Sequence, residues 1–441
     1  MGKIIEKAKE IPIIAEAELV IVGGGPAGVA AATTAAELGL KTIVIEKNGF
    51  FGGSNVAGYS GTIGGMFSSS ADLEKPLEQI VFGFAGRFAD RLEEEGGLIR
   101  QVRFGHTSLA PHDPSIWMRV ADEFVTGAGA EILFHTQFVD PIVENGVIQG
   151  VIVENKDGRG AILGKFFIDA SGDADLADRA GAETYYGKDG VIQAMTKVFR
   201  LGNVDWASIP DFSLEQVWEK VEQADQDGGY DLPRKHPFIF PAPQPGQAVM
   251  NCTAIIAEDK RVLYPTKAKD LTEAELLGRQ QILEYARFAK TYLKGFEDSY
   301  ILDTAPMIGI RQSRSVVGEY TLKNEDVAQG RKFESAIVRS AWPIEIHGGA
   351  DGVKIVNLDD DYYEIPFETM IPKGMSKMLV AGRCISAEHE ALASARVVAQ
   401  CFEEGMAAGI GAFLALKDDV DVRDVSTEII REMMKERGAN L

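Results

Sequence analysis

Residues 19–46 place a glycine-rich turn between two apolar runs, and this segment constrains the fold more than any other. Leu19 to Val22 is an apolar, mostly β-branched run of the kind found in buried parallel strands. Gly23, Gly25 and Gly28 follow with G-x-G-x-x-G spacing, ahead of an alanine-rich helical segment. A second apolar run ends at Glu46, about 20 residues past the glycines. The order of strand, turn, helix, strand and acid predicts a nucleotide-binding βαβ unit.

Each residue type in this unit has a physical role. Gly23 permits the sharp turn out of the strand, and Gly25 lets the backbone approach a pyrophosphate. Gly28 lets the helix pack closely on the strand, while the amides at the helix N-terminus favour phosphate charge. Glu46 stands where an acid binds ribose hydroxyls. A glycine-rich surface loop alone would not explain that acid.

Length, charge and cysteine content argue against several classes of protein. The chain has 441 residues, which suggests two or three domains, and a formal net charge of −21, which argues against nucleic acid as the main partner. The three cysteines are far apart and form no CxxC, so we expect neither a metal site nor a redox dithiol, and a cytoplasmic location. No run of about 18 apolar residues occurs, so we expect no membrane span.

The order of strand and helix patterns along the chain predicts two domains. Residues 138–144 and 147–154 form a predicted hairpin, and 163–169 a strand. The parallel-strand pattern returns at 377–381, before one long helix from Ala393 to about Leu416. The nucleotide-binding domain is therefore expected to be discontinuous, over 1–189 and 361–441. Residues 190–360 form the inserted domain, with an amphipathic helix at 272–295 whose buried face includes Leu276 and Leu283.

The nucleotide could be NAD, FAD or an S-adenosyl cofactor, and three features favour FAD. Gly52 and Gly53 supply a second glycine pair that can wrap the far phosphate of an extended dinucleotide. The late strand leads into Gly382-Arg383 and a helix whose N-terminus would stabilise a reduced flavin ring. No second G-x-G-x-x-G follows a strand.

Five segments then carry a family resemblance over nearly the whole chain. They are Val20–Gly28, Phe167–Ala177 with Ala180-Gly181, Asp303–Arg314, Tyr363–Pro366 and Ala381–Leu392. In these segments the chain resembles the FAD-dependent oxidoreductase family, two-domain flavoproteins related to the fumarate reductase flavoprotein and the glutathione reductase fold group. The resemblance implies an α/β fold: a Rossmann-like FAD-binding domain with a parallel sheet, helices and a β-meander, plus an inserted α+β substrate or cap domain.

The resemblance also implies which residues bind FAD. The pyrophosphate would lie on Gly23, Gly25, Pro26, Ala27 and Gly28, and the ribose on Glu46, next to Lys47. Gly52, Gly53 and Ser54 would line the flavin-side phosphate, and the backbone at Phe138 would meet the adenine. Ala170, Ser171 and Gly172 would pass the adenosine half, Gly382 and Arg383 the ribityl chain, and Arg396 and Val397 the flavin pyrimidine.

Four side chains are candidates for catalysis or substrate binding. Arg311 and Arg314 follow a glycine-containing turn, and each could grip a carboxylate or form a structural ion pair. His347 shares a strand face with Glu345, an acid that would set its tautomer; the alternative is a satisfied polar pair beneath a loop. His389 precedes the final helix and either contacts the flavin or caps the loop.

The predicted function is an FAD-dependent oxidoreductase that moves a hydride between flavin N5 and a small organic substrate, with carboxylates among the candidates. An external electron donor or acceptor is expected, and homo-oligomerisation stays open. Two alternatives remain: an electron-transfer subunit that needs a protein partner, and a biosynthetic or non-redox FAD protein. Iron–sulfur cysteine spacing would favour the first, but the chain has none.

Overall fold

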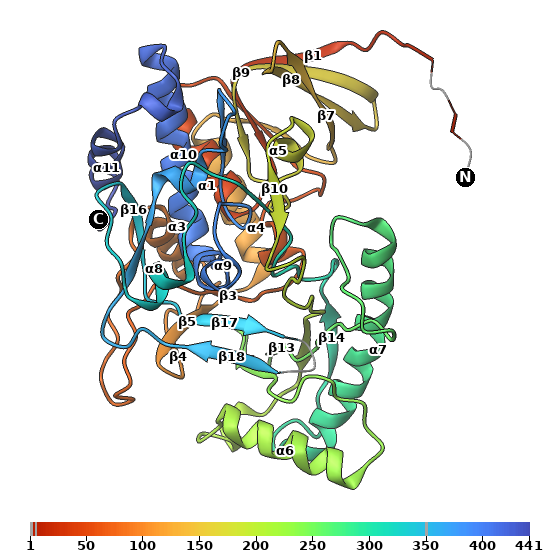
Figure 1. Ribbon diagram of the computed structural model, residues 1–441. Coiled ribbons are helices and arrows are strands. Elements are labelled where there is room, and N and C mark those ends of the chain that lie inside the picture. The colour runs from red at the N-terminus through yellow and green to blue at the C-terminus, as the bar shows by residue number, and fades with distance from the viewer. Residues whose placement is uncertain (1–2, 5–6, 349–351) are drawn as a thin grey trace.

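A seven-stranded sheet organises the larger part of the molecule (Figure 1). The computed structural model describes residues 3–4, 7–348 and 352–441. Four strands lie parallel in the order β6-β2-β1-β9, and β20 pairs in parallel with β9. Their bounds are β1 Ile13–Val22, β2 Thr42–Ile45, β6 Glu131–Leu133, β9 Gly158–Asp169 and β20 Met378–Val380.

Strand β9 joins the parallel sheet to an antiparallel meander. Its first half pairs with β8 (Val147–Asn155), which pairs in turn with β7 (Gln137–Glu144), while its last residues pair with β20. The predicted hairpin and the predicted α/β class with a Rossmann-like parallel sheet are thus confirmed. Because β1, β2, β9 and β20 all end at the same edge, the loops that follow them meet there.

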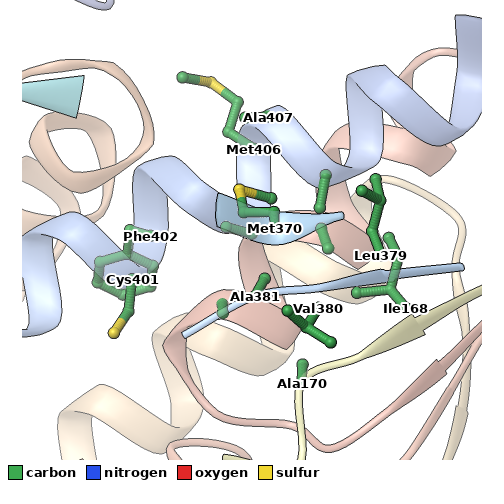
Figure 2. Close-up of a cluster of buried hydrophobic side chains, with 14 of the residues drawn as sticks. Ile168, Ala170, Met370, Leu379, Val380, Ala381, Cys401, Phe402, Met406 and Ala407 are labelled. Carbon is green, nitrogen blue, oxygen red and sulfur yellow. The ribbon is translucent and has the colours of Figure 1, made fainter. Parts of the chain in front are cut away.

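Helices α1 (Pro26–Glu37) and α10 (Val398–Asp418) cross the sheet in direct backbone contact. A Cβ at Gly405 would lie 2.1 Å from the carbonyl oxygen of Ala27, so glycine is required at this crossing. Apolar side chains of α10, such as Phe402 and Met406, pack near β20 and the end of β9 (Figure 2). Helix α1 is therefore packed between β1 and α10.

The end of the chain differs from the sequence prediction of one long helix after Ala393. The structure has α9 (His389–Ala395) and α10, bent by 88° at Arg396 and Val397. The break places Val397 at the N-cap of α10 with an extended backbone. Among the described residues, no single helix is long and apolar enough to cross a membrane, and only this bent pair would pass by length and composition.

A second cluster of buried side chains lies between residues 199 and 296, in the green part of the ribbon (Figure 1). Its sheet is antiparallel in the order β12-β13-β11-β14, and two helices pack on it. The bounds are β11 Phe199–Gly202, α6 Leu214–Asp227, β12 Phe238–Pro241, β13 Ala248–Asn251, α7 Ala268–Tyr292 and β14 Tyr300–Thr304. This is the inserted α+β unit expected from the sequence.

One expectation for α7 was wrong. Leu276 and Leu283 are 56% and 62% exposed, whereas Ile282, Tyr285 and Ala289 are buried. The buried stripe of the helix is therefore narrower than its leucines suggest.

Shorter elements complete the fold. Strand β16 (Ala336–Ser340) pairs with β19 (Tyr363–Pro366), and β17 (Ile344–His347) pairs with β18 (Val353–Val356). The division at residues 189 and 360 stays a prediction. The others are α2 Gly53–Val56, β3 Thr62–Ile63, α3 Gly83–Glu94, β4 Val102–Phe104, β5 Thr107–Pro111, α4 Pro114–Gly127, α5 Asp175–Arg179, β10 Thr184–Tyr186, β15 Arg314–Val316, α8 Asn324–Ala328 and α11 Thr427–Glu436.

Candidate active site

A long cavity opens at the carboxyl ends of the parallel strands and reaches β13 and β17. Its empty volume, counted out to its open mouth, is about 1580 Å³. The predicted cofactor residues that line it are Gly23, Gly25, Pro26, Ala27, Glu46, Lys47, Gly53, Ser54, Ala170, Ser171, Gly172, Gly382, Arg383, Arg396 and Val397. Arg311 and His347 line it as well.

The glycine turn after β1 is shaped to hold a phosphate. Gly23 has φ +105°, a conformation that favours glycine, and a Cβ at Gly28 would lie 1.9 Å from its carbonyl oxygen. A Cβ at Gly25, in contrast, would meet only the Cα of Gly53, at 3.9 Å. Gly25 caps α1 without any side-chain hydrogen bond, and no acid lies in the first turn. The free amides and the positive end of this helix fit a pyrophosphate group.

Glu46 ties the end of β2 to this turn. Its Oε2 accepts a hydrogen bond from the Gly24 amide at 2.8 Å, and its Oε1 accepts from the Asn48 amide and side chain, each at 2.8 Å. Each carboxylate oxygen has more than one acceptor direction. Glu46 can therefore brace the turn and still accept a ribose hydroxyl from the cavity.

The second glycine pair, Gly52 and Gly53, is hydrogen-bonded to the glycine turn after β1. The Gly52 amide donates to the Gly24 carbonyl at 2.8 Å, and Gly52 has φ +127°, where a Cβ would lie 2.2 Å from Cγ2 of Val56. Gly53 and Ser54 then line the cavity at the start of α2, whereas Gly52 does not. Gly52 thus shapes the loop, and Gly53 and Ser54 face the ligand space.

The loops after β9 and β20 line the cavity next to the glycine turn, since a Cβ at Gly23 would lie 2.4 Å from the Ala170 carbonyl oxygen. Arg383 pairs with Asp173 at 2.9 Å and donates to the Ser313 hydroxyl at 2.6 Å, directly over Gly172. The Gly382 amide donates to Oε2 of Glu404 at 2.7 Å. Burial raises the pKa of Glu404 well above its ordinary value, because a charged carboxylate is poorly solvated there.

Sequence reasoning missed Glu404. It stands next to Glu403 inside an otherwise small and apolar helix, and that contrast was the available signal.

Beyond the cofactor residues the cavity ends in a group that we call the basic chamber: Arg234, Arg311, Arg396, Glu345 and His347. All five are buried or partly buried, and all except Arg234 line the cavity. His347 Nε2 lies 2.9 Å from Oε1 of Glu345, and Arg234 Nη2 lies 3.4 Å from His347 Nδ1. Asn251 binds two of the arginines: its Oδ1 accepts from Arg234 Nη1 and from Arg311 Nη2, each at 3.0 Å.

Protonation in the chamber follows from burial and from the guanidinium charges. Burial, with Arg311 nearby, lowers the pKa of His347 well below its ordinary value, so the imidazole is neutral at pH 7. Burial alone would raise the pKa of Glu345, yet His347, Arg234 and Arg396 lower it to about 2. Burial lowers the pKa of Arg396 to about 10, which leaves it charged. The described chamber thus holds three cations and one anion.

Arg396 faces this space with unused hydrogen-bonding capacity. Its Nη2 has one long contact, 3.4 Å to Gln193, and its Nε is buried with no partner among the described residues. The break between α9 and α10 directs this residue into the cavity. A buried donor without a partner costs free energy, so a ligand atom that accepts from it would be stabilised.

Five predicted residues lie outside the cavity lining: Gly52, described above, and Arg314, His389, Gly28 and Phe138. Arg314 forms ion pairs with Asp175, at 2.6 Å, and with Asp178, and its Nε donates to the Asp173 carbonyl, so its guanidinium is used within the protein. His389 lies against Gly187. Gly28 is packed on the turn, and Phe138 is buried in the meander beneath Arg179.

Comparison with known proteins places this site in a family. The family model described as FAD dependent oxidoreductase matches residues 18–434. The thiamine thiazole synthase of Aeropyrum pernix is 29% identical over 136 residues, which is 31% of this chain and 43% of that protein. The thiamine thiazole synthase of Methanococcus aeolicus is 30% identical over 174 residues, which is 37% of this chain and 57% of that protein. The chain thus spans about half the length of these curated relatives.

Solved structures match this chain only at low identity and with TM-scores under 0.5. The match to a geranylgeranyl bacteriochlorophyll reductase-like protein from Thermoplasma acidophilum covers 96% of this chain and 84% of that chain. The identity is 15% and the TM-score is 0.45. The match of the family model over nearly the whole chain carries the assignment. The resemblance inferred from the five sequence segments is confirmed: the chain belongs to the FAD dependent oxidoreductase family, and its cofactor is FAD.

Proposed function

We propose that this chain is a dehydrogenase or reductase that moves a hydride between flavin N5 and a small organic carboxylate. The observation that carries the proposal is the charge of the basic chamber, where Arg234, Arg311 and Arg396 face the single carboxylate of Glu345. Buried guanidinium groups are costly unless an anion pairs with them. A carboxylate substrate would supply that anion.

Arg311 is the residue we propose for gripping the substrate. Its Nη1 donates to the Ala194 carbonyl at 3.0 Å and its Nη2 to Asn251, so the planar group is held in one orientation at the cavity wall. A held guanidinium can direct a carboxylate by a paired hydrogen bond, which a flexible ammonium cannot do as well. Arg396, at the break between α9 and α10, would supply a second hydrogen-bond donor to the carboxylate.

FAD, when bound, supplies the acceptor or donor of the hydride. We propose that its pyrophosphate lies on Gly23, Gly25 and the start of α1, and that Glu46 accepts from its ribose. Gly53, Ser54, Gly382 and Arg383 would follow the far phosphate and ribityl chain, and Arg396 and Val397 would reach the flavin ring. Contact of the adenine with Phe138 stays a prediction.

The proton that accompanies the hydride falls to the protein, and we propose His347 for it. Glu345 accepts from Nε2, so Nδ1, which lies 3.4 Å from Arg234 Nη2, is the basic atom of the neutral imidazole and would take up the proton as that long contact opens. The charge of Arg311 is one cause of the low pKa of His347. A substrate carboxylate bound to Arg311 would offset that charge, so His347 would become a stronger base when substrate is present.

The test is anaerobic reduction of the bound flavin by a panel of small carboxylates, each paired with its amide or methyl ester. We expect bleaching of the flavin absorbance by at least one acid and none by its neutral partner. For a reductase, oxidation of the chemically reduced protein by an unsaturated or oxo acid gives the same answer. If only neutral compounds reduce or reoxidise the flavin, the carboxylate proposal is wrong.

A second candidate function is a biosynthetic FAD protein without net redox turnover. The observation in its favour is that the curated relatives named above are thiamine thiazole synthases. A flavin that neither acids nor neutral compounds reduce or reoxidise would favour this candidate. The cytoplasmic location, the external electron carrier and an oligomeric state stay predictions; all three cysteines are free and buried, which fits a reducing compartment.

A further inference from the structure

Asn251 lies at the centre of the basic chamber and makes an unusual set of contacts. It ends β13 and lines the cavity. Its single Oδ1 accepts from Arg234 and Arg311 at 3.0 Å each, and also from the Thr196 hydroxyl at 3.2 Å. One neutral oxygen therefore holds two guanidinium groups side by side.

An amide at position 251 is electrostatically less favourable for the folded protein than a carboxylate would be. Two cations that share one acceptor repel each other, and a carboxylate of the same shape would neutralise one of them. Arg311 shows the effect: burial, and then the charges of Arg234 and Arg396, lower its pKa well below the ordinary value. Asn251 positions both arginines but adds no negative charge of its own, so Glu345 remains the one carboxylate beside the three guanidinium groups of the described chamber.

We propose that Asn251 is a positioning residue that determines specificity for anions, because its neutral amide holds Arg234 and Arg311 in place while it leaves their positive charge for the substrate. The inference rests on the proposed function, since it explains how the chain keeps a carboxylate site from being filled by its own acid. A carboxylate at position 251 would occupy the two arginines and exclude the substrate's.

The test compares Asn251→Asp with the wild-type holoenzyme, using acetate as the probe at constant ionic strength and the flavin absorbance as the signal. Asp has nearly the same shape, so the variant adds one negative charge. We expect the dissociation constant of acetate to rise about tenfold or more. We also expect the midpoint potential of the flavin to become more negative, because a nearby anion disfavours reduction.

Two further variants separate charge from position. Gln247→Glu is the matched control: Gln247 Oε1 accepts from Arg200 at 3.4 Å, outside the cavity lining, so acetate binding and potential should match the wild type. Asn251→Leu removes the acceptor without adding charge, and it should weaken acetate binding without making the potential more negative. If Asn251→Leu binds acetate as the wild type does, the positioning role is wrong.

The outcomes also separate this inference from the proposed function. If the wild type binds acetate and Asn251→Asp binds it equally well, the role of Asn251 is overturned and the carboxylate site stands. If the wild type does not respond to acetate or to other small acids, the proposed function fails. The potential then decides alone: a more negative value in Asn251→Asp supports the charge-setting role, and an unchanged value overturns it.

Discussion

Gly28 on α1 packs so closely on the turn after β1 that a Cβ would lie 1.9 Å from the carbonyl oxygen of Gly23. No rotamer can relieve this contact, because both atoms belong to the backbone scaffold. The helix can only move away from the strand, and the amides at its N-terminus would move with it. The third glycine of the motif therefore acts through packing and does not line the cavity.

We expect Gly28→Ala to lose FAD, at a cost of about 1–3 kcal/mol or more in the packing of this unit. The measurement is the ratio of flavin to protein absorbance after purification. Gly127→Ala is the matched control, since a Cβ there would meet no described atom within 4 Å and the residue ends a helix. Full FAD content in Gly28→Ala would contradict the packing argument.

Glu46→Gln should weaken FAD binding by roughly tenfold, because the amide NH₂ would have to face one of the N–H donors that Glu46 now accepts. Those donors are Gly24, at 2.8 Å, and Asn48. The check is a titration of the apoprotein with FAD followed by flavin fluorescence. Glu37→Gln, at the exposed C-terminal end of α1, should bind FAD as the wild type does. Equal affinity of the two variants would remove Glu46 from the site.

Arg311→Lys should keep the charge of the chamber and lose the planar fork. We expect acetate, or the productive acid once found, to bind roughly ten- to hundredfold more weakly, as for lost hydrogen bonds between charged groups. Arg279→Lys on α7 is the control, because that side chain is 58% exposed. Unchanged binding in Arg311→Lys would show that Arg311 does not grip the ligand.

The buried acid Glu403 should make stability depend on pH. Burial raises its pKa to about 8 from 4.5, while its Oε1 accepts from the Ala85 amide at 3.0 Å. Because the pKa is raised in the folded state, the stabilisation that the protonated Glu403 contributes to folding is complete below pH 4.5. This stabilisation is lost as the pH rises towards 8. The loss is limited to roughly 1.4 kcal/mol per pH unit for one proton.

Glu403→Gln should remove this part of the pH dependence, because the amide stays neutral throughout. The measurement is the free energy of unfolding by denaturant at pH 5, 6, 7 and 8. The curves of wild type and variant should differ in slope, with the wild type losing more stability as the pH rises. Parallel curves would mean that Glu403 is ionised in the folded protein.

The sequence predicted the parts of the site that are local in the chain, and of the residues that only the fold brings together it missed Arg234 and Asn251. The turn from Gly23 to Gly28 and the acid Glu46 belong to one βαβ unit, so their spacing carries the information. The basic chamber draws Arg234 from a polar loop and Asn251 from the end of a strand, and nothing near either residue marks it. Pairing within the antiparallel sheet decides which residues meet there.

Two local predictions failed for reasons of tertiary structure. The run around Arg396 contains neither glycine nor proline, so the sequence predicted an unbroken helix where the structure bends by 88°. The Cys401 amide donates to the Val397 carbonyl at 3.1 Å, where α10 begins. Leu276 and Leu283 fit an amphipathic pattern, and yet no described element covers them.

Glu345→Gln should separate the binding of an anion from the chemistry that follows. Removing the only carboxylate of the described chamber raises its positive charge, so we expect acetate to bind several-fold more tightly. The same change weakens the 2.9 Å contact that orients His347 and sets its tautomer. Reduction of the flavin by the productive acid should therefore be slower, by about tenfold to a hundredfold, even at saturation.

A merely structural role for Glu345 would not produce this opposite movement of affinity and rate, because misfolding would impair both. Glu319→Gln, which breaks a surface ion pair with Arg423, serves as the control and should change neither quantity. The decisive measurement is stopped-flow flavin reduction across substrate concentrations, which yields the dissociation constant and the limiting rate from one data set. Weaker binding with an unchanged limiting rate would mean that Glu345 itself contacts the substrate and that His347 does not depend on it.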